Sequence, residues 1–223
     1  MATNYNPSIV TDNLVLCLDA ANTKSYPGSG TTWYDMSSRN RNSTLTNGPT
    51  FSTDNLGCFD FDGGNDYVNL NFVFTQSSSA NSYTVVTAAK LDTSSTNKRQ
   101  IFSSDNGGFD WGYGTVGGSN SVYSIFTGSN QVNGSSMDTN WHIFTGQWSS
   151  SFGTRLWVDD NLDIDTSTIG YDSSINAQTN LGRNPSYGEY FNGKIAFCLI
   201  YEKALTETEI KQNYYALKGR FGL

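Results

Sequence analysis

The chain has 223 residues, of which 36% are hydrophobic, 14% aromatic and 15% charged, and its formal net charge is −7 at pH 7. Aromatic residues recur along the whole length, so the chain can fill one large core and is not a disordered segment. The acidic balance, with no basic cluster denser than Lys98-Arg99, excludes a nucleic-acid surface. No apolar run approaches the roughly 18 residues that a membrane span needs.

Residues 1–13 are polar and are expected to form an extended arm outside the domain, which occupies residues 14–223. The arm carries Ile9 and Val10, which suit an extended segment docking on the sheet edge of a neighbouring protein. Short apolar runs separated by Gly, Asn and Asp turns predict strands along most of the domain. They cover residues 14–18, 59–61, 67–68, 83–89, 101–102, 111–113, 122–126, 141–148, 154–158 and 194–201. The last run is apolar on both faces, which predicts a central strand buried on both sides.

One helix is predicted near the C-terminus. Thr206 is its N-cap, and Glu209 stands three residues later, where it completes a capping box. Apolar residues at i, i+4 and i+7 give the helix one stripe to lay against the sheets: Ile210, Tyr214 and Leu217. Gly219 is expected to end the helix.

A Gly-rich turn between residues 59–61 and 67–68 predicts a hairpin. Asp62, Asn65 and Asp66 in this turn offer the hard oxygen ligands that Ca²⁺ takes, so Ca²⁺ is the one cofactor that the sequence suggests. The alternative is that these side chains make Asx-turn hydrogen bonds that shape the turn without a metal. A second and weaker acidic cluster would form if the early loop folds back and brings together Asp19, Asn22 and Asp35.

The cysteines and the single histidine are expected to be structural. Cys17, Cys58 and Cys198 lie in apolar, strand-like contexts without C-x-x-C spacing, which favours buried thiols over a disulfide. His142 is the only histidine, so a metal site with two His ligands is excluded. Its place in the alternating run WHIFTGQW predicts a packing role with its hydrogen bonds satisfied.

Four segments stand out in chain order: LDAAN with WYDMSSRNRN; FDFDGGNDYV; WHIFTGQW followed by RLWVDDN; and LGRNPSYGEYFNGKIAFCLIYEKALTETEIKQNYYALKGRFG. Together they resemble the laminin G-like family of concanavalin A-like jelly-roll domains, and the arrangement is similar to such domains in structural proteins of tailed, especially marine, bacteriophages. The resemblance implies an all-β fold, a two-sheet antiparallel jelly-roll sandwich with one short C-terminal helix. It also implies glycan recognition, adhesion or protein docking through loops at one rim, often with Ca²⁺.

Two pairs of aromatic residues are candidates for stacking on a sugar ring. Trp111 and Tyr113 are two residues apart in DWGYG and therefore share one face of a strand. Tyr187 and Tyr190 in PSYGEYF are expected in a loop near the rim. For each residue alone, packing in the core is the alternative.

The carboxylates argue against an enzyme. A retaining glycanase needs two carboxyl groups about 5–5.5 Å apart. The resemblance would place them in a Glu-x-Asp-x-Glu run on one strand, and the chain has no such run. Its glutamates all stand at or beyond position 189: Glu189, Glu202, Glu207 and Glu209. Asp159 and Asp160 are adjacent and would point to opposite faces of a strand.

The predicted function is a non-catalytic phage virion structural protein, a capsid decoration, fibre or tail-associated component with a lectin-like adhesive surface. Its partners would be other virion proteins, further copies of itself and cell-surface glycan, with no nucleic acid or membrane. The alternative is a lectin that recognises host-surface glycans, and a poorer alternative is a glycanase. The start MATNYNPSIVTDN has no signal-peptide pattern, so the expected location is the virion, after synthesis in the host cytoplasm.

Overall fold

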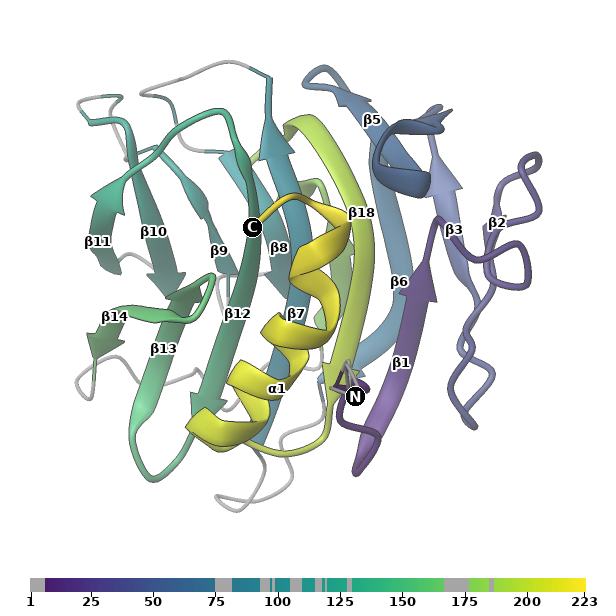
Figure 1. Ribbon diagram of the computed structural model, residues 1–223. Coiled ribbons are helices and arrows are strands. Elements are labelled where there is room, and N and C mark those ends of the chain that lie inside the picture. Colours follow the sequence, from purple (N-terminus) through teal and green to yellow (C-terminus); the bar gives the residue numbers. More distant parts are fainter. Residues whose placement is uncertain are drawn as a thin grey trace.

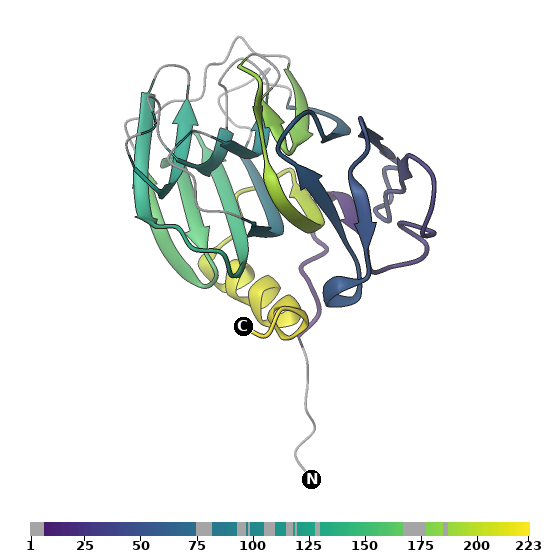
Figure 2. The ribbon, with the colours of Figure 1, turned by 90° about the horizontal axis from the view of Figure 1, so that it is seen from above.

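The computed structural model describes residues 7–74, 82–92, 97, 99–104, 110–114, 118, 120–127, 130–166, 177–184 and 187–223. Within these ranges the chain forms two antiparallel sheets of eight strands each, packed face to face, and one C-terminal α-helix, α1 (Glu207–Leu217) (Figures 1 and 2). The predicted two-sheet, all-β sandwich is confirmed. No helix in these ranges is long and apolar enough to cross a membrane.

The first sheet contains, in spatial order, β14 (Asn161–Thr166), β13 (Gly153–Val158), β12 (Trp141–Ser149), β7 (Ser82–Leu91), β18 (Asn192–Tyr201), β5 (Cys58–Asp62) and β4 (Thr50–Ser52), with β1 (Leu14–Asp19) also paired to β18. The second sheet contains β11 (Asn130–Ser136), β10 (Val122–Thr127), β9 (Asp110–Tyr113), β8 (Arg99–Ser104), β15 (Ala177–Leu181), β6 (Tyr67–Phe74), β3 (Ser43–Thr46) and β2 (Thr32–Trp33). A separate two-stranded hairpin is formed by β16 (Arg183–Asn184) and β17 (Glu189–Tyr190).

The first sheet is built on β18. This strand pairs with β7 along its length, with β5 through its first half and with β1 through its second half. Alternate side chains enter the core between the sheets and a second apolar cluster beneath α1: Ile195, Cys198 and Ile200 on the inner side, Phe197, Leu199 and Tyr201 on the outer side. The central strand predicted for residues 194–201 is therefore confirmed, and both of its faces are occupied.

The helix α1 lies across the outer face of the first sheet (Figure 1). The predicted capping box is confirmed, because the Glu209 N–H donates to Thr206 Oγ1 at 3.3 Å and the Thr206 N–H donates to Glu209 Oε2 at 2.9 Å. The prediction that Gly219 ends the helix is wrong. The chain instead tightens into a 3₁₀ turn, η2 (Lys218–Arg220), and the left-handed residue is Gly222 at φ +75°. The extra turn carries Phe221 to the ring of Trp141, 4.9 Å between centroids.

Residues 8–10 pack on their own domain, which corrects the expected boundary of a free arm at residue 13. The Val10 N–H donates to Asn213 Oδ1 at 2.8 Å, and the Val10 carbonyl accepts from the Tyr201 hydroxyl at 2.9 Å. Asn213 Nδ2 also donates to that hydroxyl oxygen at 3.1 Å, and both Val10 and Asn213 are buried. One amide thus joins the N-terminal segment, α1 and β18. Residues 1–6 lie outside the described ranges.

Asn213→Ala is expected to lower the free energy of unfolding by about 1–3 kcal/mol, because it leaves the buried Val10 N–H without an acceptor. Guanidinium denaturation measures the change. Gln212→Ala is the matched control, since Gln212 donates to the Ser8 carbonyl at 2.8 Å in an exposed position. An equal loss of unfolding free energy in the two variants would show that burial of the Asn213 amide contributes nothing to stability.

The sheets are tied together along one edge, where β11 of the second sheet meets β14 of the first. The Ser135 N–H donates to both carboxylate oxygens of Asp163, each at 3.0 Å. Gly134 makes room for this carboxylate, because a Cβ atom there would lie 1.9 Å from Asp163 Oδ2. This edge of the sandwich is closed by side-chain contacts rather than left as two free strands.

His142 on β12 joins the turns that flank this edge. Its Nδ1 lies 2.7 Å from Asp159 Oδ2 and its Nε2 lies 3.1 Å from Asp138 Oδ1. The ring packs edge-on against Tyr123 and Phe144. Burial lowers the pKa of the imidazole, but the hydrogen bonds and charges of Asp159 and Asp138 outweigh it, so the net pKa is raised. The satisfied packing role predicted for this histidine is confirmed.

Because its pKa is raised on folding, protonated His142 stabilises the native state below an unfolded pKa of about 6.5, and this stabilisation is lost as the pH rises through the folded pKa. Asp138, Asp159 and Tyr123 are the titratable groups that face it. The difference in unfolding free energy between the wild-type protein and His142→Gln should therefore shrink steadily as the pH is raised from about 6. A difference independent of pH would contradict the assignment.

The three cysteines are buried free thiols, as predicted. Burial, reinforced by the charges of Asp35 and Asp19, raises the pKa of Cys17 to about 12. Burial also raises the pKa of Cys58 and of Cys198. Since the thiolate is the reactive form, these side chains are inert at neutral pH and act as small apolar residues.

Candidate functional site

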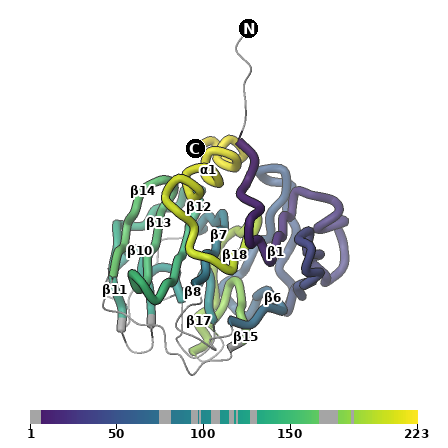
Figure 3. The backbone as a smooth tube through the Cα atoms, turned by 90° about the horizontal axis from the view of Figure 1, so that it is seen from below, coloured from purple at the N-terminus to yellow at the C-terminus, as the bar shows by residue number. Residues whose placement is uncertain are grey.

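The outer face of the second sheet carries no helix within the described ranges, in contrast to the first sheet. Figure 3 shows β15 and β17 on the side of the molecule opposite α1. On β9, Trp111 and Tyr113 belong to the core, so Asp110 and Gly112 point outward. The strand register then places Ser124 of β10 and Gln100 of β8 on either side of Gly112.

Polar side chains continue this outward face across the sheet. Asn180 of β15 pairs with Asn69 of β6, which pairs with Thr44 of β3. At the other end, Ser124 pairs with Asn133 of β11. We call this set the polar face: Thr44, Asn69, Asn180, Gln100, Asp110, Ser124 and Asn133. Its central members Asn180, Gln100, Asp110 and Ser124 are buried, whereas Thr44 and Asn133 at its ends are exposed.

The β16–β17 hairpin lies against the centre of the polar face. Gln100 Nε2 donates to Glu189 Oε2 on β17 at 3.3 Å. Asn184 Nδ2 on β16 donates to Asp110 Oδ2 at 2.9 Å, while Asp110 Oδ1 accepts from the Ser104 N–H at 2.9 Å. The hairpin is therefore anchored to the sheet by side-chain hydrogen bonds at two points.

Several buried polar atoms at this junction have no hydrogen-bond partner among the described residues. They are Gln100 Oε1, Ser103 Oγ and Arg183 Nε. The Gly182 N–H donates to the Ile101 carbonyl at 3.0 Å, which brings Arg183 alongside Gln100. The Arg183 guanidinium lies over the Tyr67 ring, 3.9 Å from its centroid, and this contact fixes its direction. Such atoms cost free energy unless water or a ligand satisfies them.

The chemistry of the site follows from these groups. It offers an acceptor on Gln100, a donor on Arg183 and a hydroxyl on Ser103 that can do both. An aromatic ring, Tyr67, lies beside them. Alternating donors and acceptors next to an aromatic ring suit a ligand with many hydroxyl groups and one apolar face.

The structure places the two aromatic pairs predicted to stack on sugars in different environments. Trp111 and Tyr113 do share one face of β9, but that face points inward and both side chains are fully buried. Trp111 stacks on Phe102 with ring centroids 5.9 Å apart, and burial raises the pKa of Tyr113 to about 12. The prediction that this pair presents rings to a sugar is wrong, because the alternation of β9 places it in the core.

Tyr187 and Tyr190 belong to the hairpin that covers the polar face. Tyr187 is 65% exposed at the turn, and Tyr190 is half-buried on β17, where it pairs with Arg183. The fold thus pairs Tyr190 with Arg183 and brings their hairpin to Gln100 through Glu189. Neither Gln100 nor Arg183 was predicted from the sequence. The sequence gives only a weak indication of these polar positions, because an amide or serine at alternate positions of a strand is also typical of an ordinary solvent-facing residue.

The turn at residues 62–66 is a corner rather than the predicted hairpin, because β5 belongs to the first sheet and β6 to the second. Asp62 Oδ1 accepts from the Gly64 N–H at 2.7 Å, and Asp66 Oδ2 accepts from the Asp62 N–H at 3.2 Å. The Asn65 carbonyl accepts from Asn47 Nδ2 at 2.9 Å. Burial above all raises the pKa of Asp66. These bonds are those of the Asx-turn alternative, and the described residues contain no group of three or more acidic, His or Cys side chains arranged for a metal.

The second acidic cluster is not formed. Asp35 Oδ1 accepts from the Cys17 N–H at 2.9 Å and caps the free edge of β1. Asp19 pairs with Arg220 at 2.6 Å, and Asn22 accepts from the Lys24 N–H at 3.0 Å. The three side chains serve three separate structural contacts.

A protein-family model described as the concanavalin A-like lectin/glucanases superfamily matches residues 62–211, more than half of the chain. The chain belongs to this superfamily. The comparison with curated proteins finds no match. Membership agrees with the architecture described above and confirms the resemblance to concanavalin A-like domains, whereas nothing in the comparisons shows a phage origin.

Solved structures give the same fold at low sequence identity. Trypanosoma rangeli sialidase in complex with the inhibitor DANA has a TM-score of 0.68 at 12% identity over 95% of this chain. The match covers only 35% of the sialidase chain, so this superfamily member spans about a third of that protein. Domain 4 of AbnA, a GH43 extracellular arabinanase from Geobacillus stearothermophilus, in complex with arabinotriose, has a TM-score of 0.67 at 15% identity, covering 92% of this chain and 100% of that one. The binding domain of Paraclostridial Mosquitocidal Protein 1 has a TM-score of 0.63 at 14% identity, covering 91% and 52%.

The corner of this superfamily member allows a direct choice between an Asx-turn and a calcium site. Asp62→Ala should lower the melting temperature by about 2–4 °C, the effect of losing roughly one net hydrogen bond in a domain of this size. Asp62→Asn should cost less, because its amide oxygen can still accept from the Gly64 N–H. A calcium site would instead be established if Ca²⁺ raised the melting temperature of the wild-type protein and a chelator returned it to its starting value. Both variants should then show no response to Ca²⁺.

Proposed function

We propose that this protein is a non-catalytic carbohydrate-binding domain and that the polar face, with the β16–β17 hairpin, is its binding surface. The observation that carries the proposal is the group of buried, unpartnered polar atoms of Gln100, Ser103 and Arg183 on the outer face of the second sheet. Arg183 lies over the Tyr67 ring, and Tyr187 is exposed at the turn of the same hairpin. A sugar can stack on the exposed Tyr187 ring, and it can hydrogen-bond to the buried atoms when the hairpin that covers them shifts.

One structural neighbour supports this class of ligand. The arabinanase domain is described in complex with arabinotriose, whereas the mosquitocidal protein domain is described as a binding domain with no ligand stated. The proposal therefore puts the lectin, the alternative of the sequence analysis, ahead of a virion structural role. The docking of residues 8–10 on α1 also removes part of the arm that was to attach the protein to a particle.

The absence of catalysis is part of the proposal and rests on how the nearby carboxylates are used. Asp110 is fully buried, and each of its oxygens accepts a hydrogen bond from the protein. Glu189 accepts from Gln100. These contacts hold the hairpin in place, so both carboxyl groups are engaged in structural hydrogen bonds.

Gln100→Leu is expected to weaken oligosaccharide binding at least about tenfold, or about 1.4 kcal/mol. It should change the melting temperature by no more than about 2–4 °C, because removal of the unpaired buried oxygen offsets the loss of the hydrogen bond to Glu189. Isothermal titration calorimetry with arabinotriose and a panel of neutral oligosaccharides measures the binding.

Tyr187→Ala should also weaken binding, and Tyr215→Ala is its matched control. Tyr215 is another exposed tyrosine, 46% accessible, but it lies on α1 at the opposite side of the molecule. Loss of binding in Tyr215→Ala with none in Gln100→Leu or Tyr187→Ala would place the ligand elsewhere. Hydrolysis of any oligosaccharide in the panel would contradict the non-catalytic assignment.

A further inference from the structure

One loop of the first sheet presents an apolar side chain to solvent in a strained conformation. Leu56, in the 3₁₀ turn η1 (Asp54–Leu56), is 76% exposed at φ +70°, and the preceding Asn55 has φ +48°. A left-handed conformation is costly for a bulky residue and persists only where its surroundings enforce it.

Arg220 enforces it. Its Nε donates to the Asn55 carbonyl at 2.6 Å and its Nη2 donates to the Gly57 carbonyl, so the carbonyls on both sides of the Leu56 backbone are held by one guanidinium. Asn55 Nδ2 donates back to the Arg220 carbonyl at 3.0 Å. Arg220 Nη1 is itself paired with Asp19 at 2.6 Å. The loop is thus fixed to the C-terminal segment with Leu56 projecting outward.

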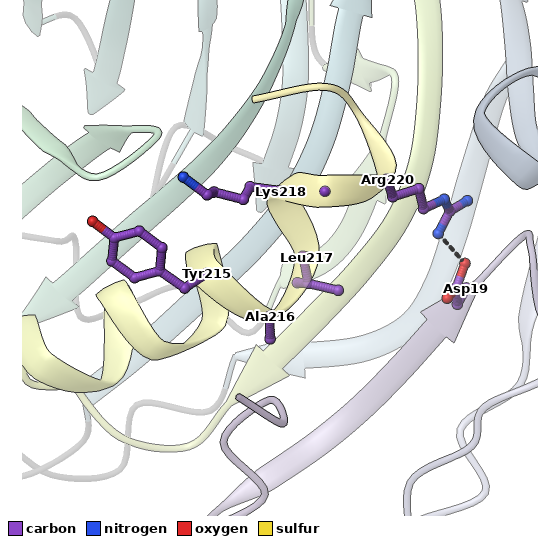
Figure 4. Close-up of a pocket in the computed structure, with 7 residues that line it drawn as sticks. Asp19, Tyr215, Ala216, Leu217, Lys218 and Arg220 are labelled. Atoms are coloured by element: carbon purple, nitrogen blue, oxygen red, sulfur yellow. Dashed lines mark hydrogen bonds and ion pairs between the residues drawn. The ribbon is translucent and has the colours of Figure 1, made fainter. Parts of the chain in front are cut away.

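The same arginine lines a hollow at the end of α1. The hollow has a volume of about 320 Å³ and is bounded by Asp19 and residues 215–220 (Figure 4). Ala216, Leu217 and the Tyr215 ring supply its apolar part. Figure 4 shows Arg220 reaching toward Asp19 on one side, while Tyr215 and Lys218 extend to the other. The projecting leucine and the hollow are therefore neighbours, joined by Arg220.

We propose that this surface pairs two copies of the chain, with Leu56 of each copy inserted in the hollow of the other. A projection next to a hollow is self-complementary under two-fold rotation, because a single axis between them satisfies both contacts at once. Charge agrees with this pairing. The Asp54 side chain stands two residues before Leu56; it is 61% exposed, and its Oδ2 lies 3.9 Å from Lys194 Nζ of the same chain. Lys218 at the hollow lies over the rings of Tyr214 and Tyr215, 5.2 Å and 4.8 Å from their centroids. Each Leu56 insertion brings Asp54 of one copy toward Lys218 of the other.

The pairing has a consequence that rests on the proposed function. The interface lies on the α1 side, whereas β15 and β17 lie on the opposite side (Figure 3). The two polar faces would therefore point away from each other, and the interface would cover neither of them. Two linked binding surfaces raise the apparent affinity for a ligand that repeats along a polymer or a cell surface.

Sedimentation velocity over a range of concentrations tests the pairing. The wild-type protein should show a monomer–dimer equilibrium, and Leu56→Asn should shift it at least about tenfold toward monomer. Asparagine tolerates the left-handed conformation well, so this variant should fold and melt at the same temperature as wild type or higher. Tyr34→Ser is the matched control, since Tyr34 is an exposed apolar residue outside the hollow and is 43% accessible.

A charge exchange tests the geometry independently of folding. Asp54→Lys and Lys218→Glu should each be monomeric alone, because each places like charges together at both contacts. An equimolar mixture of the two variants should form the heterodimer, because both contacts then join opposite charges.

A wild-type protein that remains monomeric up to about 1 mM overturns the proposal. So does a dimer that survives Leu56→Asn and both single charge variants. Dimerisation without any oligosaccharide binding would leave the pairing intact and remove only the proposed function.

Discussion

Strand β18 is buried on both faces, and both apolar clusters of the molecule are built around it. Its inner side chains fill the space between the sheets, and its outer side chains require a second cover, which α1 and the C-terminal residues supply. Three strands pair with it, so the first sheet cannot rearrange without exposing both apolar clusters. Both faces of the first sheet are therefore covered, whereas the outer face of the second sheet carries no helix within the described ranges.

On the second sheet, the alternation of side chains along β9 determines which residues lie on the outer face. The inward rings of Trp111 and Tyr113 are inseparable from the outward positions of Asp110 and Gly112, because adjacent side chains of a strand point to opposite faces. The missing side chain at Gly112 lets the strands approach closely, since a Cβ atom there would lie 2.0 Å from the Arg99 carbonyl oxygen. The hairpin then closes over the centre through Glu189 and Asn184. Packing of the core thus determines which side chains of β9 face outward, and a few polar contacts with the hairpin complete the candidate site.

The parts of the fold that the sequence predicted correctly are those with local or redundant signals. The capping box depends on residues three positions apart, and the eight-residue apolar run of β18 cannot be placed at a surface. The missed features depend on contacts distant in sequence. The pattern around residues 59–68 is the same for a hairpin and for a corner between sheets, and which one forms depends on β18 and β15 as partners. Gln100, Arg183 and Tyr67 come together only through the register of β8, β15 and β6, which no local pattern encodes. The inward direction of Trp111 likewise could not be told from alternation, because alternation fixes which residues share a face but not which face is buried.

The proposed ligand surface is the polar face of the second sheet together with the β16–β17 hairpin. The most direct measurement is a titration of the ¹⁵N-labelled protein with arabinotriose, or with the tightest-binding neutral oligosaccharide, followed by two-dimensional NMR. We expect shifts of the Gln100 and Asn180 side-chain amides and of the backbone amides of β8, β16 and β17, with the amides of α1 unchanged. Shifts confined to α1, or to the corner at residues 62–66, would contradict it.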